Sequence, residues 1–335
     1  MNFYINKRNF EYLVLQKFIN IEHPYNFFKN ITILEYFLSS SYLLKHGNIH
    51  SGDIIMKKIK IFLVLVLSLT LFTGIQSTEA ASNVKVHFIN VGQGDSILIQ
   101  TGNENILIDA GGKGKGDEVV AYLKKQKVKT LHAVVLTHPD ADHVGGLAYV
   151  VNKLKVKAVY APKVSHTTQA YKSFLTAVKK KKLTIKNAKS GVEIKTKAKN
   201  ITLKFIAPVK TYKQSDLNNW SAVLLLKHDK KSFLFTGDAE EKSEKDMLAK
   251  KLVPSVDVLK VGHHGAKAST SSAFVKKAKP KYAIISVGKK NAYGHPTSTV
   301  LKRLNSIKAK TYRTDKSGNI IFTSTGTKLT VKTVK

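Results

Sequence analysis

The sequence predicts an α/β domain built in layers, with many strands. Short apolar runs separated by turns recur between residues 84 and 323, and longer stretches with helical spacing of apolar residues lie between them. The composition agrees, because 43% of the 335 residues are hydrophobic and 9% are aromatic, which is ordinary for a chain with a substantial core. We find no Pro-, Gly- or Ser-rich linker and no internal repeat, so residues 82–335 are treated as one domain.

The expected strands follow from the short apolar runs, and the expected helices follow from the helical spacing of apolar residues. The short apolar runs predict strands at Val84–Val91, Ser96–Gln100, Ile106–Ile108, Val134–Leu136, Ala158–Tyr160, Ile201–Ile206, Ala222–Leu226, Phe233–Phe235, Val256–Val261, Tyr282–Val287 and Ile320–Thr323. The helical spacing predicts helices at Glu118–Lys125, Val144–Leu154, Gln169–Lys179, Glu240–Lys250, Ser272–Lys279 and Ser298–Ile307.

Residues 56–81 have the layout of a secretory signal peptide. A basic start at residues 57–60 precedes an apolar run at 61–75 and a small-residue cleavage region at 78–81. We therefore expect a secreted protein. The alternative is a membrane anchor through residues 59–75, although this run is shorter than the ~20 apolar residues that span a bilayer.

Residues 1–55 would precede that signal peptide, where a folded domain is hard to place. Their mixture of Tyr, Phe, Asn and Ile shows no sustained period. We interpret them as a non-native, spurious extension from an upstream start codon. The alternative is a genuine extension that turns the apolar run into an anchor.

Positive charge is the strongest feature of the composition. The formal net charge is +34, and residues 1–81 hold eight Lys or Arg and five Asp or Glu, which leaves +31 for the remainder. Such a field attracts polyanions, and outside a cell the candidates are DNA, RNA, teichoic acids and anionic lipid. An equally weighted interpretation of this charge is a solvated lysine-rich surface that associates with an anionic cell wall. Lys greatly outnumbers Arg, and Lys favours non-specific phosphate contacts.

Four residues with metal-ligand side chains follow a buried strand within six positions: His138, Asp140, Asp142 and His143. Pro139 prevents a helix from running through the cluster, so the segment is expected to be a loop, with a helix starting near His143. The chain has no cysteine, so a metal must be held by histidines and carboxylates, and this cluster suits a two-metal site. The alternative is an N-capped helix start, but capping needs one carboxylate and no histidines.

Other ligand-type residues also stand just past predicted strands. They are Asp238, His263, His264 and His295. Taken singly, Asp238 could be a helix cap and His295 an ordinary turn residue. Their shared placement at the ends of strands favours one common site.

These residues and several other motifs of the sequence resemble those of a known family. The run Thr137–Gly146 resembles the metal motif His-x-His-x-Asp-His of the metallo-β-lactamase superfamily, in the form found in ComEC-like competence proteins, which have Asp at the second position. The other motifs of that pattern follow in order at Phe88–Ser96, Ile108–Gly111, Thr236–Asp238, Lys260–Gly265, Ile285–Gly288 and Tyr293–Pro296. The resemblance covers nearly all of residues 84–335 and implies a four-layer αββα sandwich with metals at one edge between two sheets.

The resemblance also implies roles for individual residues. The implied metal ligands are His138, Asp140, Asp142, His143, Asp238 and His295, with Asp238 as the bridging carboxylate. The implied catalytic residues are His263, His264 and Asp142, and the two histidines would contact phosphate or act as a general acid. The residues expected to orient ligands are Asp95, Asp109, Asn219 and Ser221. For Asp95 and Asp109, turn geometry alone is an equal alternative.

Two departures from the family pattern concern the metals. Asp140 stands where many members have His, and Asn218–Ser221 occupies the place of a histidine that usually lies between the main motif and the bridging Asp. The donor set is therefore richer in oxygen, so we expect one or two divalent ions, either zinc or manganese.

The expected function is that of a secreted metal-dependent hydrolase, a phosphodiesterase or nuclease that cleaves DNA with a metal-activated water. Lys267 and the surface lysines would hold the polyanion. The alternatives are a phosphodiesterase on wall or lipid phosphodiesters, a lactonase or β-lactamase, and a non-catalytic polyanion-binding protein. No nucleotide cofactor is expected, because no Gly-Lys-Ser/Thr signature follows the turn glycines Gly92, Gly94, Gly111 and Gly112.

Overall fold

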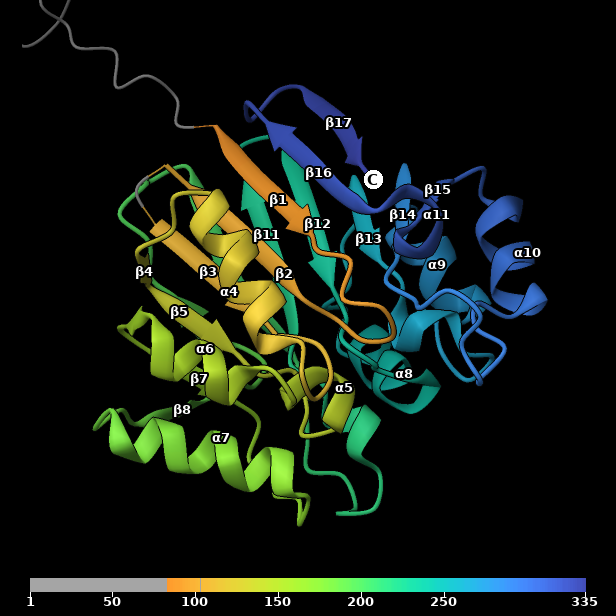
Figure 1. Cartoon of the computed structure of the whole chain (residues 1–335). Coiled ribbons are helices and arrows are strands. Elements are labelled where there is room, and N and C mark those ends of the chain that lie inside the picture. Colours follow the sequence, from red (N-terminus) through yellow and green to blue (C-terminus); the bar gives the residue numbers. More distant parts are fainter. Residues whose placement is uncertain (1–82, 103) are drawn as a thin grey trace, which may run out of the picture. The chain divides into compact units, whose positions relative to one another are not determined.

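The computed structural model describes residues 83–102 and 104–335 (Figure 1). The predicted extension at 1–55 and the predicted signal peptide at 56–81, with the alternative anchor at 59–75, lie outside the described residues. Within the described ranges, no helix combines the length and the hydropathy that a bilayer crossing requires.

Two large sheets form the centre of the domain. The first sheet has the order β17 (Leu329–Val334), β16 (Asn319–Ser324), β1 (Val84–Phe88), β2 (Ile97–Thr101), β3 (Glu104–Ile108), β5 (Ala133–Val135), β7 (Val159–Ala161) and β8 (Ile185–Asn187). The second sheet has the order β15 (Lys310–Arg313), β14 (Tyr282–Ile285), β13 (Val258–Lys260), β12 (Lys231–Phe235), β11 (Val223–His228), β10 (Ile201–Ala207) and β9 (Glu193–Ile194). A separate pair joins β4 (Thr130–Leu131) to β6 (Lys155–Val156).

Helices cover the outer faces of both sheets (Figure 1). Those associated with the first sheet are α4 (Gly116–Lys125), α5 (Ala141–Val144), α6 (Leu147–Lys153) and α7 (Gln169–Lys180). Those associated with the second sheet are α8 (Glu241–Ala249), α9 (Ser272–Ala278) and α10 (Ser298–Ser306), while α11 (Thr314–Ser317) joins β15 to β16. Two short 3₁₀ helices lie in loops, at η3 (Leu217–Trp220) and η4 (Gly262–Gly265).

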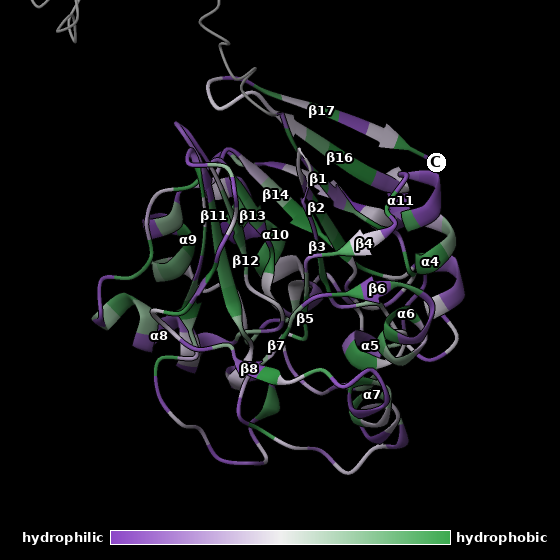
Figure 2. Ribbon diagram, turned by 90° about the vertical axis from the view of Figure 1, so that its left-hand side faces the viewer, coloured by the Kyte–Doolittle hydropathy of each residue, from purple (hydrophilic) through white to green (hydrophobic). Residues whose placement is uncertain are grey.

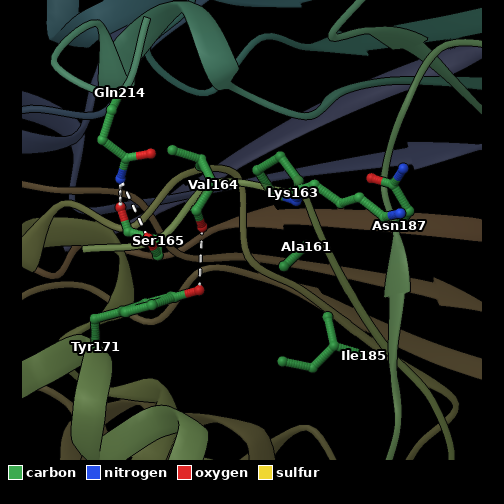
Figure 3. A pocket seen from close by; sticks show the side chains of 9 residues that line it. Ala161, Lys163, Val164, Ser165, Tyr171, Ile185, Asn187 and Gln214 are labelled. Atoms are coloured by element: carbon green, nitrogen blue, oxygen red, sulfur yellow. Dashed lines mark hydrogen bonds between the residues drawn. The ribbon is translucent and has the colours of Figure 1, made fainter. Parts of the chain in front are cut away.

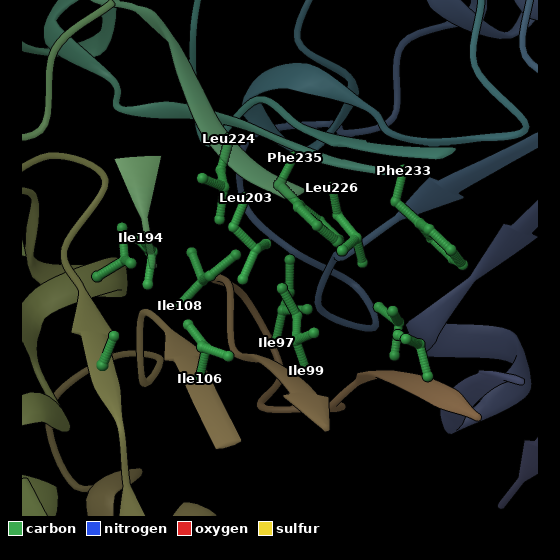
Figure 4. Packing of buried hydrophobic residues seen from close by; sticks show 14 of the residues in the cluster. Ile97, Ile99, Ile106, Ile108, Ile194, Leu203, Leu224, Leu226, Phe233 and Phe235 are labelled. Atoms are coloured by element: carbon green, nitrogen blue, oxygen red, sulfur yellow. The ribbon is translucent and has the colours of Figure 1, made fainter. Parts of the chain in front are cut away.

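The core is layered in the same way. The inner faces of the two sheets pack together, with Ile97 and Ile99 of β2 facing Phe233 and Phe235 of β12 in one apolar cluster (Figure 4). Leu98, between those two isoleucines, packs on the helix side instead, because successive strand residues point to opposite faces. The apolar residues therefore lie between the layers and the polar ones outside (Figure 2). The order helix, sheet, sheet, helix confirms the predicted αββα sandwich.

All the strands and helices predicted from the longer apolar patterns are present, with boundaries shifted by a few residues. The elements that the patterns did not reveal are the short helices α5, α11, η3 and η4, the short strands β4, β6, β8 and β9, and the edge strands β15 and β17. These strands are brief or rich in lysine, and an edge strand with a solvated face needs few apolar residues.

A glycine turn between β1 and β2 lies against the loop that follows β5. Gly94 has φ +124°, and a Cβ at this position would overlap the backbone carbonyl oxygen of Asp142. The neighbouring Asp95 backbone N–H donates to that same oxygen at 3.3 Å. The absence of a side chain at Gly94 thus sets the position of the segment that carries Asp142.

We expect Gly94→Ala to lower the free energy of unfolding by about 2–3 kcal/mol, through backbone strain and displacement of the Asp142 segment. Gly92→Ala is the matched control, since Gly92 also has a positive φ of +77° but a Cβ there would meet nothing within 4 Å. It should cost only about 1–2 kcal/mol. Urea denaturation measures both, and equal losses would show that contact with Asp142 is unimportant.

Candidate metal centre

The predicted site residues gather at one edge of the two sheets. The segment with His138 to His143 follows β5, which runs parallel to β3. The expected loop ends at Asp140, because helix α5 begins at Ala141 and carries Asp142 and His143. Asp238 follows β12 and His264 follows β13, and these two strands are also parallel. Because parallel strands end at the same edge, the folding of each sheet brings its loops together there.

Four side chains, two from each sheet, form a compact group that we call the four-ligand cluster: Asp142, His143, Asp238 and His264. One ligand atom from each lies within 4.8 Å of the others. The Nε2 atom of His264 is 3.1 Å from Asp142 Oδ2 and 3.2 Å from Asp238 Oδ2. The Nε2 atom of His143 is 3.3 Å from Asp238 Oδ2. Asp238 thus lies centrally, between imidazoles from both sheets.

Unpaired buried atoms show what this cluster can hold. Among the described residues, Nε2 of His138, Nε2 of His143 and Oδ1 of Asp238 are buried and make no well-aligned hydrogen bond, although a carboxylate oxygen lies 3.3 Å from each of the two nitrogens. Leaving a buried polar atom unpaired costs about 1–3 kcal/mol. Imidazole nitrogens and carboxylate oxygens are donors that divalent transition metals accept, so the residues fit a divalent metal ion.

His138 and Asp140 form a second, smaller group beside the cluster. The His138 Nε2 and Asp140 Oδ2 atoms are 3.3 Å apart, and the His138 ring lies 4.2 Å from the His143 ring between centroids. These two residues could complete a second metal position together with Asp238. They supply only two donors of their own, whereas the four-ligand cluster supplies four.

Asp109 holds His143 in place from behind. Its Oδ2 atom lies 2.8 Å from His143 Nδ1 and accepts a hydrogen bond from Thr137 Oγ1 at 2.6 Å. Its Oδ1 atom accepts from the Thr137 backbone N–H at 2.8 Å. The pairing at Nδ1 directs Nε2 of His143 into the cluster, which is how a carboxylate can orient a ligand histidine.

Asp95 lies beside the cluster and pairs with a buried lysine. Lys260 is fully buried, and its Nζ atom lies 2.7 Å from Asp95 Oδ2 and 3.6 Å from Asp238 Oδ1. It also donates to the backbone oxygen of Gly237 at 3.0 Å. Burial alone would lower the pKa of Lys260, but the Asp95 and Asp238 carboxylates raise it, so the side chain is a fixed positive charge behind Asp238.

The two adjacent histidines of η4 have different positions. His263 and His264 both have positive φ values, +43° and +51°, a conformation that costs non-glycine residues energy and is concentrated at functional sites. His264 is 1% exposed, and its Nδ1 pairs with the Ser286 backbone oxygen at 2.8 Å. The His263 side chain is 26% exposed, and its Nδ1 lies 2.9 Å from Glu240 Oε1. His264 therefore belongs to the cluster, while His263 lies at its solvent side.

The remaining predicted residues are spread around the edge. Ser221 accepts a hydrogen bond from the backbone N–H of Asp238 at 3.0 Å, whereas Asn219 bonds to Asp216 and to the backbone of Ser243, away from the cluster. His295 lies outside the four-ligand cluster, with its ring 5.5 Å from that of His263.

Lys267 is exposed on the loop after His264. Its backbone oxygen accepts a hydrogen bond from Arg303 at 3.2 Å. This contact fixes the loop.

The electrostatics of the cluster favour protonated histidines in the absence of metal. Burial alone would lower the pKa of His264, but the carboxylates of Asp238 and Asp142 outweigh burial and raise it to about 9. The pKa of His143 is likewise raised well above its usual value, against burial, by Asp238, Asp142 and Asp109. At neutral pH both imidazoles therefore carry a proton that a metal ion must displace.

We expect metal binding at pH 7 to release about two protons per ion, and metal affinity to rise as the pH increases from 7 towards 9. The sign follows from the raised pKa values, because below them the imidazoles are charged and cannot coordinate. Calorimetric titration in buffers of different ionisation enthalpy measures the proton release. An affinity that is constant over this pH range would show that the histidines bind the ion without losing protons.

Two functional contacts were not identified from the sequence. Lys260 stands at the end of an otherwise apolar strand, and a lysine in such a place signals a buried charge with a partner. Glu240 stands at the beginning of a predicted helix, and its pairing with His263 depends on the tertiary fold.

The chain matches one protein-family model and is similar to several known proteins. Residues 89–289 match the model of the metallo-beta-lactamase superfamily. The chain is 32% identical over 262 residues to ComE operon protein 3 of Bacillus subtilis (strain 168), covering 72% of this chain and 33% of that protein. It is 30% identical over 241 residues to Recombination protein 2 of Haemophilus influenzae, covering 70% of this chain and 28% of that protein. The chain thus spans roughly a third of the length of these curated relatives.

Solved structures are also similar. The crystal structure of the metallo-beta-lactamase fold protein YhfI from Bacillus subtilis gives a TM-score of 0.48 at 13% sequence identity, covering 72% of this chain and 100% of that chain.

Proposed function

The chain belongs to the metallo-beta-lactamase superfamily and has the fold of a metal-dependent hydrolase, and we propose that it is an exported phosphodiesterase whose substrate is DNA. The observation that carries the proposal is the four-ligand cluster at the shared edge of the sheets, in a chain with a net charge of +34. Metal chemistry suits phosphodiester cleavage, and the positive charge favours a polyanionic substrate. A relative named Recombination protein 2 supports a nucleic acid.

Some residues of the site would hold the metal ion, and another would transfer a proton to the leaving oxygen. Asp142, His143, Asp238 and His264 would hold the ion, and His138 with Asp140 would contribute to a second position. A divalent ion, zinc or manganese, supplies Lewis-acid polarisation of a phosphoryl oxygen and activation of water near neutral pH.

His263 is the group best placed to give a proton to the leaving oxygen. Its Nε2 atom is 3.7 Å from Asp238 Oδ2, and Glu240 fixes the ring through Nδ1. The side chain is partly exposed, so a substrate atom can reach it, whereas His264 is enclosed by the cluster. Lys267 and the other exposed lysines would bind the phosphate backbone without sequence preference.

The test is hydrolysis of single- and double-stranded DNA and of bis-p-nitrophenyl phosphate by the full chain, with manganese or zinc. His138→Ala should lose DNA cleavage. His132→Ala is the matched control, because His132 precedes β5 and so lies at the strand end away from the cluster. Turnover of the small diester alone would move the substrate to wall or lipid phosphodiesters, and metal-dependent turnover of neither would contradict the proposal.

A further inference from the structure

A cavity of about 410 Å³ lies between the loop that follows β7 and strand β8, and it has no assigned role (Figure 3). It is formed by the end of β7, the loop after it, β8, and the loop before η3. Its volume is in the range of small-ligand sites, roughly 300–1,000 Å³. Lys163, Ser165 and Gln214 at its rim are exposed, so the cavity is accessible from solvent.

The cavity is connected to the metal centre by adjacent strands. The backbone N–H of Leu136 donates to the carbonyl oxygen of Tyr160 at 2.9 Å, which places the ends of β5 and β7 side by side. The chain after β5 leads to His138, and the chain after β7 forms the cavity wall. Neighbouring strands are about 4.8 Å apart, so the wall begins one strand away from the metal loop.

A second connection runs through the loop before β11. Gln214 donates to the backbone oxygen of Ser165 at the rim, and Trp220 packs with Val164 in a small apolar cluster. The same segment ends at Ser221, whose hydroxyl accepts from the Asp238 backbone. One segment therefore borders both the cavity and the four-ligand cluster.

The lining has the chemistry of a nucleotide site. Ala161, Val164 and Ile185 supply an apolar surface, and Asn187 supplies an amide that can both donate and accept hydrogen bonds. The Lys163 side chain extends towards Asn187 (Figure 3). None of the nine lining residues is acidic, so nothing there repels a phosphate. An apolar wall fits the face of a planar base better than it fits a polyol.

We propose that this cavity is a subsite for one nucleotide of a polynucleotide, adjoining the phosphodiester that is cleaved at the metal centre. The base lies against the apolar wall near Asn187, and its phosphate is held by Lys163. This inference rests on the proposed function, because it assumes a nucleic-acid substrate.

The test compares the double variant Lys163→Ala/Asn187→Ala with the wild-type full chain. For an oligonucleotide, kcat/KM relative to that for bis-p-nitrophenyl phosphate should fall about tenfold, mainly through KM, because one charged and one neutral hydrogen bond are lost. Thymidine monophosphate, titrated in the presence of EDTA, should bind the variant about tenfold more weakly. Lys186→Ala is the matched control, since Lys186 lies between Ile185 and Asn187 on β8 but faces Tyr160 instead of the cavity.

The outcomes separate the two proposals. If DNA is cleaved but the variant equals the wild type in both assays, the subsite is wrong and the proposed function stands. Tighter binding of glycerol 3-phosphate than of thymidine monophosphate also overturns the nucleotide subsite. If the wild type cleaves no phosphodiester, the proposed function fails. Weaker binding of thymidine monophosphate by the variant would then still support the subsite, and equal binding would overturn it.

Discussion

Replacing Asp238 with asparagine is expected to reduce hydrolytic turnover by at least about a thousandfold. Asp238 Oδ2 lies within 3.3 Å of the Nε2 atoms of both His143 and His264, and its Oδ1 atom is buried without a hydrogen-bond partner. An amide keeps the shape of the side chain but removes the negative charge that faces the ion. Metal ions contribute several kcal/mol to transition-state stabilisation, and each 1.36 kcal/mol is about tenfold in rate.

The measurements are turnover of bis-p-nitrophenyl phosphate and metal content after dialysis. Asp117→Asn is the matched control, because Asp117 is an exposed carboxylate in the first turn of α4 and undergoes the same chemical change. It should retain wild-type turnover and metal content. Full metal content together with wild-type turnover in Asp238→Asn would remove Asp238 from the metal centre.

Replacing Lys260 with methionine is expected to lower the free energy of unfolding by about 3–5 kcal/mol. The Nζ atom of Lys260 is buried between Asp95 and Asp238, at 2.7 Å and 3.6 Å from their oxygens. Methionine fills similar space but leaves two buried carboxylates without their shared cation. Breaking one side of a buried pair is costly because the remaining charge stays out of water.

Urea denaturation of the metal-free protein measures this loss. Lys227→Met on β11 is the matched control, since Lys227 is exposed and its replacement should change stability by no more than about 0.5 kcal/mol. The double variant Lys260→Met/Asp95→Asn should recover part of the loss, because it removes both charges of one pair. An unchanged unfolding midpoint in Lys260→Met would show that the ammonium is dispensable.

The inner strands could be predicted because they are buried on both faces. In β2, Leu98 packs towards the helices while Ile97 and Ile99 pack towards the other sheet, so the run is continuously apolar. The edge strands could not be predicted in the same way. In β17 most side chains are exposed, so its alternation carries little information about burial.

The site could be predicted in outline, because the members of the four-ligand cluster all stand after the ends of strands. Which histidine enters the cluster depends on the backbone conformation, which the spacing of residues in the sequence does not reveal. Two consecutive left-handed residues turn His264 into the cluster and leave His263 beside Glu240. The four-ligand cluster forms only when the two sheets pack face to face, and apolar contacts between the sheets determine how they pack.

The sheet edges give the lysines of this protein a role in solubility. In the two large sheets, exposed Lys186, Lys310 and Lys332 lie on the edge strands β8, β15 and β17, while the fourth edge strand, β9, has two residues. An edge strand offers unpaired backbone groups to another molecule, and charged side chains or a very short strand prevent such self-association. Part of the positive charge therefore opposes edge-to-edge pairing between copies of the chain. A polyanion that neutralises these lysines would remove that protection, so saturating the protein with polyanion favours coprecipitation through its sheet edges.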